Sequence, residues 1–361
     1  MAAKPHKLPR GGVQPRPAVA AMAAYSPPTA GRAGKLRLDF NENTVGCSPR
    51  VIDALHEGLD AASLAVYPEY GEAKRRIADY FEVKPEQFVF TNGTDEAIQV
   101  FLNTYVDDGQ EVLLLKPAYA MYRFYAEVAG ARIREVEYPQ PGMEFPLEAL
   151  LEAITPETRA VLLANPNNPT GTGVSLLGIE RILRRARKAA VLVDEAYYEF
   201  SGVTALREIE RVPNLFVSRT FSKVFGMAGM RLGCLLSHEA NIGYLHKAQS
   251  PYSVNSLAVV AAQAAVADMD YIRNYVAEVL AARELLCYGL EELGIRYVPS
   301  SANFVLGDFG ARSAEVRDAL GAQAILVRDR SYEAPGYVRI TAGTREQTRR
   351  LLAALEGIWL R

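Results

Sequence analysis

The sequence contains one lysine, Lys223, whose neighbours favour a reactive amine. Lys223 follows the apolar run 215–217, which is typical of a buried strand, and hydroxyl and glycine residues surround it within 219–231. Burial disfavours the ammonium form and so lowers the pKa of a lysine. The neutral amine is a nucleophile that forms a Schiff base with an aldehyde. A solvated loop lysine is the ordinary alternative for this segment taken alone.

Donors for an anion accompany this lysine. Thr220 and Ser222 carry hydroxyl groups and Arg231 carries a guanidinium. Charge-assisted hydrogen bonds from such donors suit a dianionic phosphate. The segment 219–231 therefore indicates an amine that lies beside a phosphate site.

A second phosphate site is indicated by Gly93, Thr94 and Asp95, which lie between an expected strand and an expected helix. Free backbone N–H groups at the start of a helix bind anions, and a glycine lets the ligand approach closely. By itself this motif favours an ordinary capped helix start over a phosphate site.

Two further strand ends carry unusual polar residues. The loop 165–173 reads Asn-Pro-Asn-Asn-Pro-Thr-Gly-Thr-Gly, which favours a rigid loop whose amide groups could donate to a phenolic or carbonyl oxygen. A purely structural turn is the alternative. Asp194 follows the apolar run 190–193, and a carboxylate buried at that point needs a partner such as a protonated pyridine nitrogen. Tyr197 could then hydrogen-bond a ring oxygen.

Together these groups meet the needs of pyridoxal 5'-phosphate. They supply a Schiff-base lysine, an acid for the ring nitrogen, donors for the ring oxygen and a phosphate site. Neither a Gly-x-Gly-x-x-Gly motif after a strand nor a Walker P-loop occurs in the sequence. A metal at Asp194 and Glu195 is not expected, because no histidine cluster accompanies them.

The elements that must position these residues alternate along the chain. Apolar runs predict strands at 87–90, 111–115, 131–136, 160–164, 190–193, 215–217 and 232–236. Helical periodicity predicts helices at 48–58, 72–81, 93–105, 119–129, 147–154 and 176–188. This alternation is typical of an α/β fold in which a mostly parallel, seven-stranded sheet lies between helices. Ligands bind such sheets beyond the carboxyl ends of the strands, where the polar motifs lie.

Beyond Pro251 the pattern changes, which indicates a second, smaller α+β domain. Helices are expected at 256–267, 271–293, 314–320 and 345–359, and strands at 296–298, 304–306, 325–327 and 337–340. We expect an N-terminal arm at 1–34, a large cofactor-binding domain at 61–259, and a small domain made of 35–60 and 260–361. A chain of 361 residues is long enough for two domains.

Net charge, apolar runs and cysteine spacing argue against several classes of protein. The formal net charge of −2 argues against a general nucleic-acid binder, which needs a basic surface. No apolar run approaches the roughly 20 residues of a membrane helix. The three cysteines are scattered without metal-ligand spacing and suit a reducing, cytoplasmic location.

The arm is basic, since lysines and arginines precede Asp39, the first acidic residue of the chain. Its apolar centre, 19–24, is short and mostly alanine, which argues against a signal peptide. A transit peptide and a flexible arm that folds over a site are the two interpretations, and we favour the flexible arm.

As a set, the motifs resemble one family over nearly the whole chain from about Tyr25. The fold-type I pyridoxal-phosphate aminotransferases have motifs similar to Asp39-Phe40-Asn41-Glu42-Asn43, Val66-Tyr67-Pro68, Pro117-Ala118-Tyr119, the loop 165–171, Asp194-Glu195-Ala196-Tyr197 and the segment 220–231. Two more stretches, 251–257 and 301–306, resemble the branch of this family that acts on histidinol phosphate.

This resemblance implies cofactor roles for the matching residues. Lys223 is implied as the Schiff-base lysine and as the base that moves a proton between substrate and cofactor. The implied ring contacts are Asp194 at the pyridine nitrogen, Tyr197 and Asn168 at the ring hydroxyl, and Tyr119 stacked on the ring face. The implied phosphate ligands are Thr220, Ser222, Arg231 and the backbone amides of Thr94 and Asp95, with Gly93 beside them.

Tyr67 is implied to reach the cofactor phosphate of the neighbouring subunit. The resemblance therefore implies a homodimer with shared active sites. For this tyrosine and the others, packing in a core or interface is the ordinary alternative.

On the substrate side, Arg339 and Arg328 match the two arginines that hold the substrate's anion. Two guanidinium groups suit one dianion, although a salt bridge to a neighbouring acid is an alternative for Arg328. Tyr25 and Asn43 are further substrate-binding candidates. The family pattern is not matched at 44–47 or in the short loop after Arg328, so the resemblance implies the cofactor more firmly than the substrate.

The implied reaction is a transamination between L-histidinol phosphate and 2-oxoglutarate, which gives imidazole acetol phosphate and glutamate in histidine biosynthesis. An aromatic amino-acid aminotransferase and a threonine-phosphate-type decarboxylase are alternatives on the same scaffold. A non-catalytic ligand-binding module is another, and the presence of Lys223 argues against it. We expect no metal, no nucleic-acid partner and no membrane partner.

Overall fold

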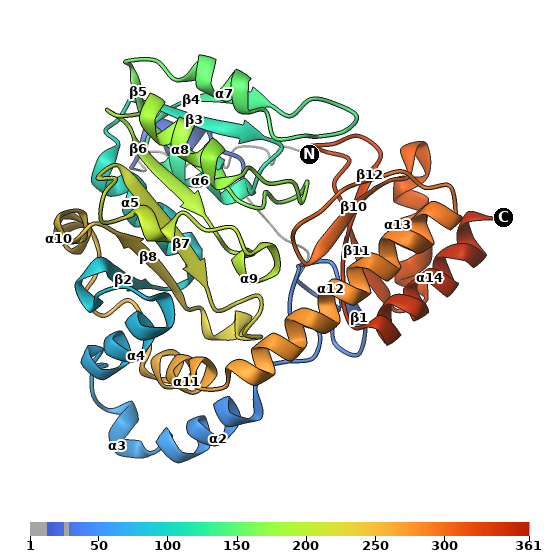
Figure 1. Cartoon of the computed structure of the whole chain (residues 1–361), viewed down its shortest axis with the longest axis horizontal. Helices are drawn as coiled ribbons and strands as arrows, with labels where there is room; N and C mark the ends of the chain where they lie inside the picture. The colour runs from blue at the N-terminus through green and yellow to red at the C-terminus, as the bar shows by residue number, and fades with distance from the viewer. Residues whose placement is uncertain (1–12, 25–28, 361) are drawn as a thin grey trace.

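The structure is a computed structural model that describes residues 13–24 and 29–360, and within them the chain forms two sheets (Figure 1). The larger sheet has seven strands in the order β2-β8-β7-β6-β5-β3-β4. These are β2 (Phe88–Thr91), β3 (Glu111–Lys116), β4 (Arg132–Glu137), β5 (Thr158–Ala164), β6 (Ala190–Asp194), β7 (Leu215–Thr220) and β8 (Gly233–Ser237). All of its pairs are parallel except those made by β8. The mostly parallel, seven-stranded sheet is confirmed.

Both faces of this sheet are buried. Successive side chains of each central strand point to opposite faces, and a layer of helices covers each face. In β3, Val112 and Leu114 pack on one face, and Leu113 and Leu115 pack on the other. The first face is covered by α5 (Gly93–Tyr105), α6 (Ala120–Val128) and α10 (Glu239–Ala248). The second is covered by α4 (Gly71–Phe81), α7 (Leu147–Ala153), α8 (Leu176–Arg185) and α11 (Ser256–Val266). The central strands β3, β5 and β6 are therefore largely apolar, whereas the edge strand β4 alternates between apolar and charged residues.

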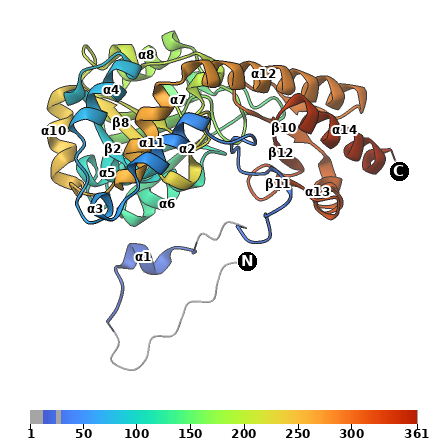
Figure 2. The same cartoon turned by 90° about the horizontal axis from the view of Figure 1, so that it is seen from below.

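The smaller sheet packs against a second group of helices (Figures 1 and 2). Its strands, in the order β1-β11-β12-β10-β9, are β1 (Leu36–Leu38), β11 (Ile325–Asp329), β12 (Tyr337–Thr341), β10 (Phe304–Asp308) and β9 (Tyr297–Val298). The helices are α12 (Met269–Glu292), α13 (Ser313–Ala322) and α14 (Arg345–Trp359). The long helix α12 joins the two parts, since Ile272 lies in the core of the large sheet and Leu286 in that of the small one.

Short elements complete the chain. They are α1 (Pro17–Ala21), α2 (Pro49–Gly58), α3 (Ala61–Leu64), α9 (Tyr198–Ser201) and the 3-10 turns η1 (Pro85–Gln87), η2 (Leu206–Glu208), η3 (Ala228–Met230) and η4 (Gly310–Arg312). The segment 35–60 divides between the two parts, because β1 pairs with β11 whereas α2 packs against α11. The domain boundaries at 60/61 and 259/260 stay a proposal.

Two local differences from the predictions have physical causes. The strand predicted at 87–90 begins at Phe88, because the Gln87 side chain accepts a hydrogen bond from the backbone N–H of Lys84 at 2.9 Å and closes a turn. Helix α10 was not predicted, since only Ile242 and Leu245 of its residues are buried and its apolar pattern is weak.

Two absences hold for residues 13–24 and 29–360. None of their helices has the length and apolar character needed to cross a membrane. Their histidine, cysteine, aspartate and glutamate side chains form no group of three that could hold a metal ion.

Candidate active site

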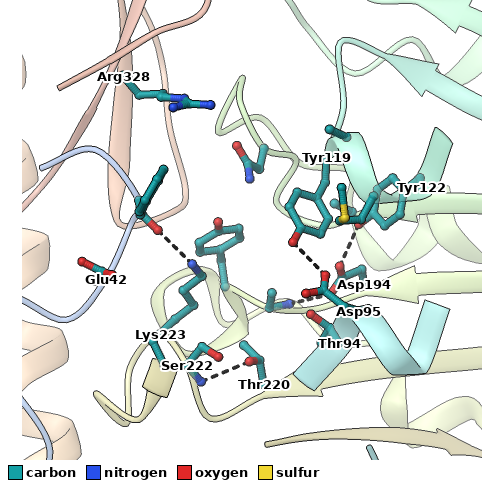
Figure 3. Close-up of a pocket in the computed structure, with 18 of the residues that line it drawn as sticks. Glu42, Thr94, Asp95, Tyr119, Tyr122, Asp194, Thr220, Ser222, Lys223 and Arg328 are labelled. Atoms are coloured by element: carbon teal, nitrogen blue, oxygen red, sulfur yellow. Dashed lines mark hydrogen bonds between the residues drawn. The ribbon is translucent and has the colours of Figure 1, made fainter. Parts of the chain in front are cut away.

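A cavity of about 570 Å³ opens where the carboxyl ends of three parallel strands face the small sheet (Figure 3). Asp194 ends β6, Thr220 ends β7, and Ala164 ends β5. Arg328 on β11 and Arg339 on β12 approach from the opposite side. The other residues predicted at the site that line this cavity are Thr94, Asp95, Tyr119, Asn168, Tyr197, Ser222, Lys223 and Arg231.

Lys223 occupies the loop after β7, and its amine points into the cavity (Figure 3). The Nζ atom donates a hydrogen bond to the backbone carbonyl of Phe40 at 3.0 Å. Burial, helped by the positive charge of Arg339, lowers the pKa of Lys223 from 10.5 to about 8. Much more of this amine is therefore neutral near physiological pH than in an ordinary lysine.

Asp194 is a buried carboxylate at the cavity floor, 4% exposed. Its Oδ2 accepts a hydrogen bond from the hydroxyl of Tyr122 at 2.7 Å, and Oδ1 accepts one from the backbone N–H of Ala196 at 3.2 Å. Burial raises the pKa of Asp194, and the Tyr122 hydrogen bond partly offsets this. Within the described residues no cation forms an ion pair with Asp194, so a protonated ring nitrogen would supply the missing positive charge.

Tyr197 and Asn168 lie where a ring hydroxyl would need donors. The Tyr197 hydroxyl accepts a hydrogen bond from the Asn41 amide at 2.9 Å, which leaves its own proton free to donate. The Oδ1 atom of Asn168 accepts from Arg339, so the Nδ2 group of this amide remains a donor. Both side chains thus retain a donor beside the cavity.

The phosphate donors gather at the start of α5 and in the loop after β7. The hydroxyl of Thr220 accepts from the backbone N–H of Ser222 at 3.1 Å, and both hydroxyls border the cavity. An Nη atom of Arg231 lies 3.0 Å from Asp95 Oδ2, which orients the guanidinium at the helix start. This set of hydroxyls, helix amides and a guanidinium fits a phosphate group.

Gly93 is not in the cavity lining, but its lack of a side chain is required there. Its φ of +75° lies in the left-handed region, and a Cβ at this position would collide with the Arg231 guanidinium. Tyr119 stands opposite, and its hydroxyl donates to Asp95 Oδ1 at 2.8 Å. Its ring borders the cavity where stacking on the cofactor was predicted (Figure 3).

The two arginines predicted to bind the substrate lie on adjacent strands, since Arg328 and Arg339 are cross-strand partners in β11 and β12. Arg339 is 4% exposed and donates to the backbone carbonyl of Asp39 at 2.6 Å as well as to Asn168. Burial and the neighbouring Arg330 lower the pKa of Arg339 to about 10, so this guanidinium stays charged at neutral pH. Both arginines can meet one anion from the same side.

Two further predicted residues, Asn43 and Tyr67, do not line this cavity. The Asn43 amide donates to the backbone carbonyl of Val224 at 3.0 Å and accepts from two backbone N–H groups, so it shapes the loop that precedes α2. Tyr67 is 73% exposed and stacks on Tyr252, with ring centroids 4.3 Å apart. Tyr25 lies outside the described residues. Their assigned roles stay predictions.

The structure also places residues at the site that the sequence did not single out. Tyr122 lies in the first turn of α6, three residues after the N-cap residue Tyr119, and both line the cavity. Arg330 lies directly after the end of β11, two residues after Arg328, and lines the cavity with it. Glu42 lines the cavity too. Burial raises its pKa, but the hydrogen bonds and charge of Arg32, together with the charges of Arg37 and Lys223, lower the pKa of Glu42 overall.

Comparison with known proteins agrees with this geometry. Residues 33–355 match the family described as aminotransferase class I and II. A histidinol-phosphate aminotransferase of Symbiobacterium thermophilum is 38% identical over 328 residues, which cover 89% of this chain and 90% of that protein. The histidinol-phosphate aminotransferase of Brevibacillus brevis is 33% identical over 331 residues, which cover 90% of both chains.

Solved structures show the same likeness. The histidinol-phosphate aminotransferase of Sinorhizobium meliloti, solved in complex with pyridoxal 5'-phosphate, superposes with a TM-score of 0.85 at 26% identity over 95% of this chain and 97% of that chain. The aspartate aminotransferase of Thermus thermophilus with maleate superposes with a TM-score of 0.77 at 26% identity, over 88% of this chain and 90% of that chain.

Pyridoxal 5'-phosphate is the cofactor of this chain, and the cavity fits it. The unpaired carboxylate of Asp194 suits the ring nitrogen, the amine of Lys223 suits the aldehyde, and the donors at the start of α5 suit the phosphate. By its sequence match, its fold and the chemistry of this cavity, the chain belongs to the class I and II aminotransferases, the pyridoxal-phosphate enzymes of fold-type I.

Proposed function

We propose that this chain transfers an amino group between L-histidinol phosphate and 2-oxoglutarate, giving imidazole acetol phosphate and glutamate in histidine biosynthesis. The observation that carries the proposal is the pair Arg328 and Arg339, which face the same cavity as the amine of Lys223. Two guanidinium groups suit the phosphate ester of one substrate and a carboxylate of the other. The names of the relatives in several bacteria support the same substrate.

In this proposal each residue has a role that follows from its position in the cavity. Bound pyridoxal phosphate supplies an electron sink for the bond that breaks at the substrate carbon. The Nζ atom of Lys223 removes the proton from that carbon and would deliver it to the reactive carbon of the cofactor, and its lowered pKa keeps the amine available as a base. Asp194 holds the ring nitrogen protonated. Arg339 orients the substrate by its anion, so the scissile C–H bond faces Lys223.

The test is a titration of the purified holoenzyme, followed by visible absorption. We expect histidinol phosphate to abolish the cofactor's initial band and 2-oxoglutarate to restore it. Phenylalanine and phosphothreonine, added separately, should leave the band in place. A response to phenylalanine instead would move the substrate to aromatic amino acids, and carbon dioxide release from phosphothreonine would identify a decarboxylase.

We also propose that the chain works as a homodimer in the cytoplasm. Apolar side chains are exposed along 59–67, where Leu64 is 60% and Val66 is 67% exposed, next to the stacked rings of Tyr67 and Tyr252. A second copy that covers this surface would bring Tyr67 to the neighbour's cofactor phosphate. Light scattering should give twice the chain mass, and Tyr67→Phe should weaken cofactor binding while the dimer persists. A monomeric holoenzyme with full activity contradicts this arrangement.

A further inference from the structure

A third guanidinium lies in the same cavity as Arg328 and Arg339. Arg330 lines the cavity and is only 5% exposed. One of its Nη atoms pairs with the carboxylate of Glu333. Its Nε atom is buried and has no hydrogen-bond partner within the described part of the chain. A buried N–H group without a partner is costly, so this atom suits an acceptor that a ligand brings.

The charges around Arg330 are unbalanced. Arg330 and Arg339 line the same cavity, and after burial the charge of Arg330 is the largest influence that lowers the pKa of Arg339. Glu333 is the carboxylate that pairs with this group, and all three arginines counteract the rise that burial causes in its pKa. Glu42, the other acid near this wall, is already bonded to Arg32. Three guanidinium groups therefore face one carboxylate, which leaves positive charge for a ligand to neutralise.

We propose that Arg330 is a specificity-determining arginine that contacts the substrate's anion and favours a phosphate monoester over a carboxylate. A phosphate monoester offers three terminal oxygens and close to two negative charges, whereas a carboxylate offers two oxygens and one charge. Arg328 and Arg339 donate hydrogen bonds to some of the phosphate oxygens, and the Nε atom of Arg330 supplies a further donor. Glu333 holds the side chain at the cavity wall before the anion arrives. The inference rests on the proposed function and extends it by naming how the phosphate is distinguished.

The test compares two amino donors that differ only in the phosphate. Holoenzymes of the wild type, Arg330→Gln and Arg330→Lys are titrated with histidinol phosphate and with histidinol, and the half-reaction gives an apparent dissociation constant for each. For Arg330→Gln we expect binding of histidinol phosphate to weaken roughly 10- to 100-fold, as for the loss of a charged hydrogen bond, while histidinol changes far less. Arg330→Lys keeps the charge without the Nε donor. Its affinity for histidinol phosphate should lie between those of the wild type and Arg330→Gln. Arg181→Gln, which removes an exposed arginine far from the cavity, is the matched control.

Inorganic phosphate gives a readout that needs no turnover. Calorimetric titration of the holoenzymes should show weaker phosphate binding in Arg330→Gln and tighter binding in Glu333→Gln, which lacks the competing carboxylate. Equal losses for histidinol phosphate and histidinol, or unchanged phosphate affinity in Arg330→Gln, would overturn the inference. If the wild type does not react with histidinol phosphate, the proposed function fails, and phosphate affinity still decides the role of Arg330. Circular dichroism of each variant excludes misfolding as the cause.

Discussion

Opposing charges set the protonation state of Lys223. Burial and Arg339 favour the neutral amine, whereas the carboxylates of Glu42 and Asp95 favour the ammonium form, and the pKa of Lys223 comes to about 8. Because the folded pKa lies below the ordinary value of 10.5, the neutral fraction rises as the pH passes through about 8. The hydrogen bond to the Phe40 carbonyl holds this amine at the cavity while its proton is exchanged.

The first prediction concerns the pH dependence of this amine. The rate at which the cofactor-free protein takes up pyridoxal phosphate should rise around pH 8, because the neutral amine reacts. Glu42→Gln removes a carboxylate that favours the ammonium form, so the inflection should move to lower pH. Stopped-flow absorbance across the alkaline range measures it, with Glu72→Gln on the exposed side of α4 as the control. An inflection that does not move in Glu42→Gln contradicts the electrostatic account.

Tyr122 allows a second test at the same scale. Tyr122→Phe removes the hydroxyl that donates to Asp194 and leaves a buried carboxylate oxygen without that partner. Hydrogen bonds to charged groups contribute about 1.5–3 kcal/mol, so cofactor binding should weaken by roughly one order of magnitude or more. Equilibrium dialysis of pyridoxal phosphate measures this. Tyr288→Phe, at a 60% exposed tyrosine on α12, should leave the affinity unchanged, and an equal loss in both variants would show a non-specific effect.

At the scale of elements, the geometry of the site depends on the backbone conformation of the residues next to the strand ends. Gly93 begins α5 directly after β2, and Arg231, with a φ of 55°, turns the chain just before β8. These two left-handed residues lie against one another, because a Cβ on Gly93 would occupy the space of the Arg231 guanidinium. The close approach places both the helix amides and the guanidinium at the proposed phosphate site.

The third prediction tests this close approach. Gly93→Ala should lower the free energy of unfolding by about 1–3 kcal/mol, because alanine is strained at positive φ and displaces Arg231. Cofactor affinity should fall with it. Gly243→Ala is the matched control, since it lies inside α10 with open space around its Cβ position, and alanine there should be neutral or stabilising. Thermal unfolding of both apoproteins measures the difference, and equal effects would contradict the steric argument.

At the scale of the whole molecule, the segment 39–43 ties the two sheets together across the cavity. The Asn41 side chain donates to Tyr197 beside the large sheet, and its Oδ1 accepts from Thr341 of β12 at 3.1 Å. Its backbone carbonyl accepts from the Asn303 amide at 3.1 Å. Because the carbonyls of Asp39 and Phe40 accept hydrogen bonds from Arg339 and Lys223, this one segment sets the spacing between the proposed substrate-binding and cofactor-binding groups.

The fourth prediction follows from this connection. Asn41→Ala loses both side-chain hydrogen bonds and forces alanine to a φ near 56°, so stability should fall by about 2–4 kcal/mol. Asn41→Gly keeps the backbone geometry and should lose less. Urea unfolding measures both, with Asn103→Ala at an exposed position of α5 as the control. If Asn41→Gly is as unstable as Asn41→Ala, the positive φ at this position does not contribute to the loss of stability in Asn41→Ala.

Much of the fold follows from patterns that are local in the chain. Apolar runs such as 160–164 and 190–193 predict buried parallel strands, and β5 and β6 lie there. Because the carboxyl ends of parallel strands share one edge, residues after different strands, such as Asp194 and Thr220, were expected together, and both line the cavity. The weakly patterned helix α10 was missed because its identity depends on packing against α5 and β2.

The sequence by itself determined the chemical groups and the strand ends that carry them, since residue type and hydrophobic period are properties of short segments. Only the tertiary structure decided which partners those groups meet. The hydrogen bond from Tyr122 to Asp194 and the one from Lys223 to the carbonyl of Phe40 join residues 72 and 183 positions apart in the chain. Such contacts, and the pKa shifts that they and burial produce, arise from the packing of two sheets around one cavity, which no local pattern encodes.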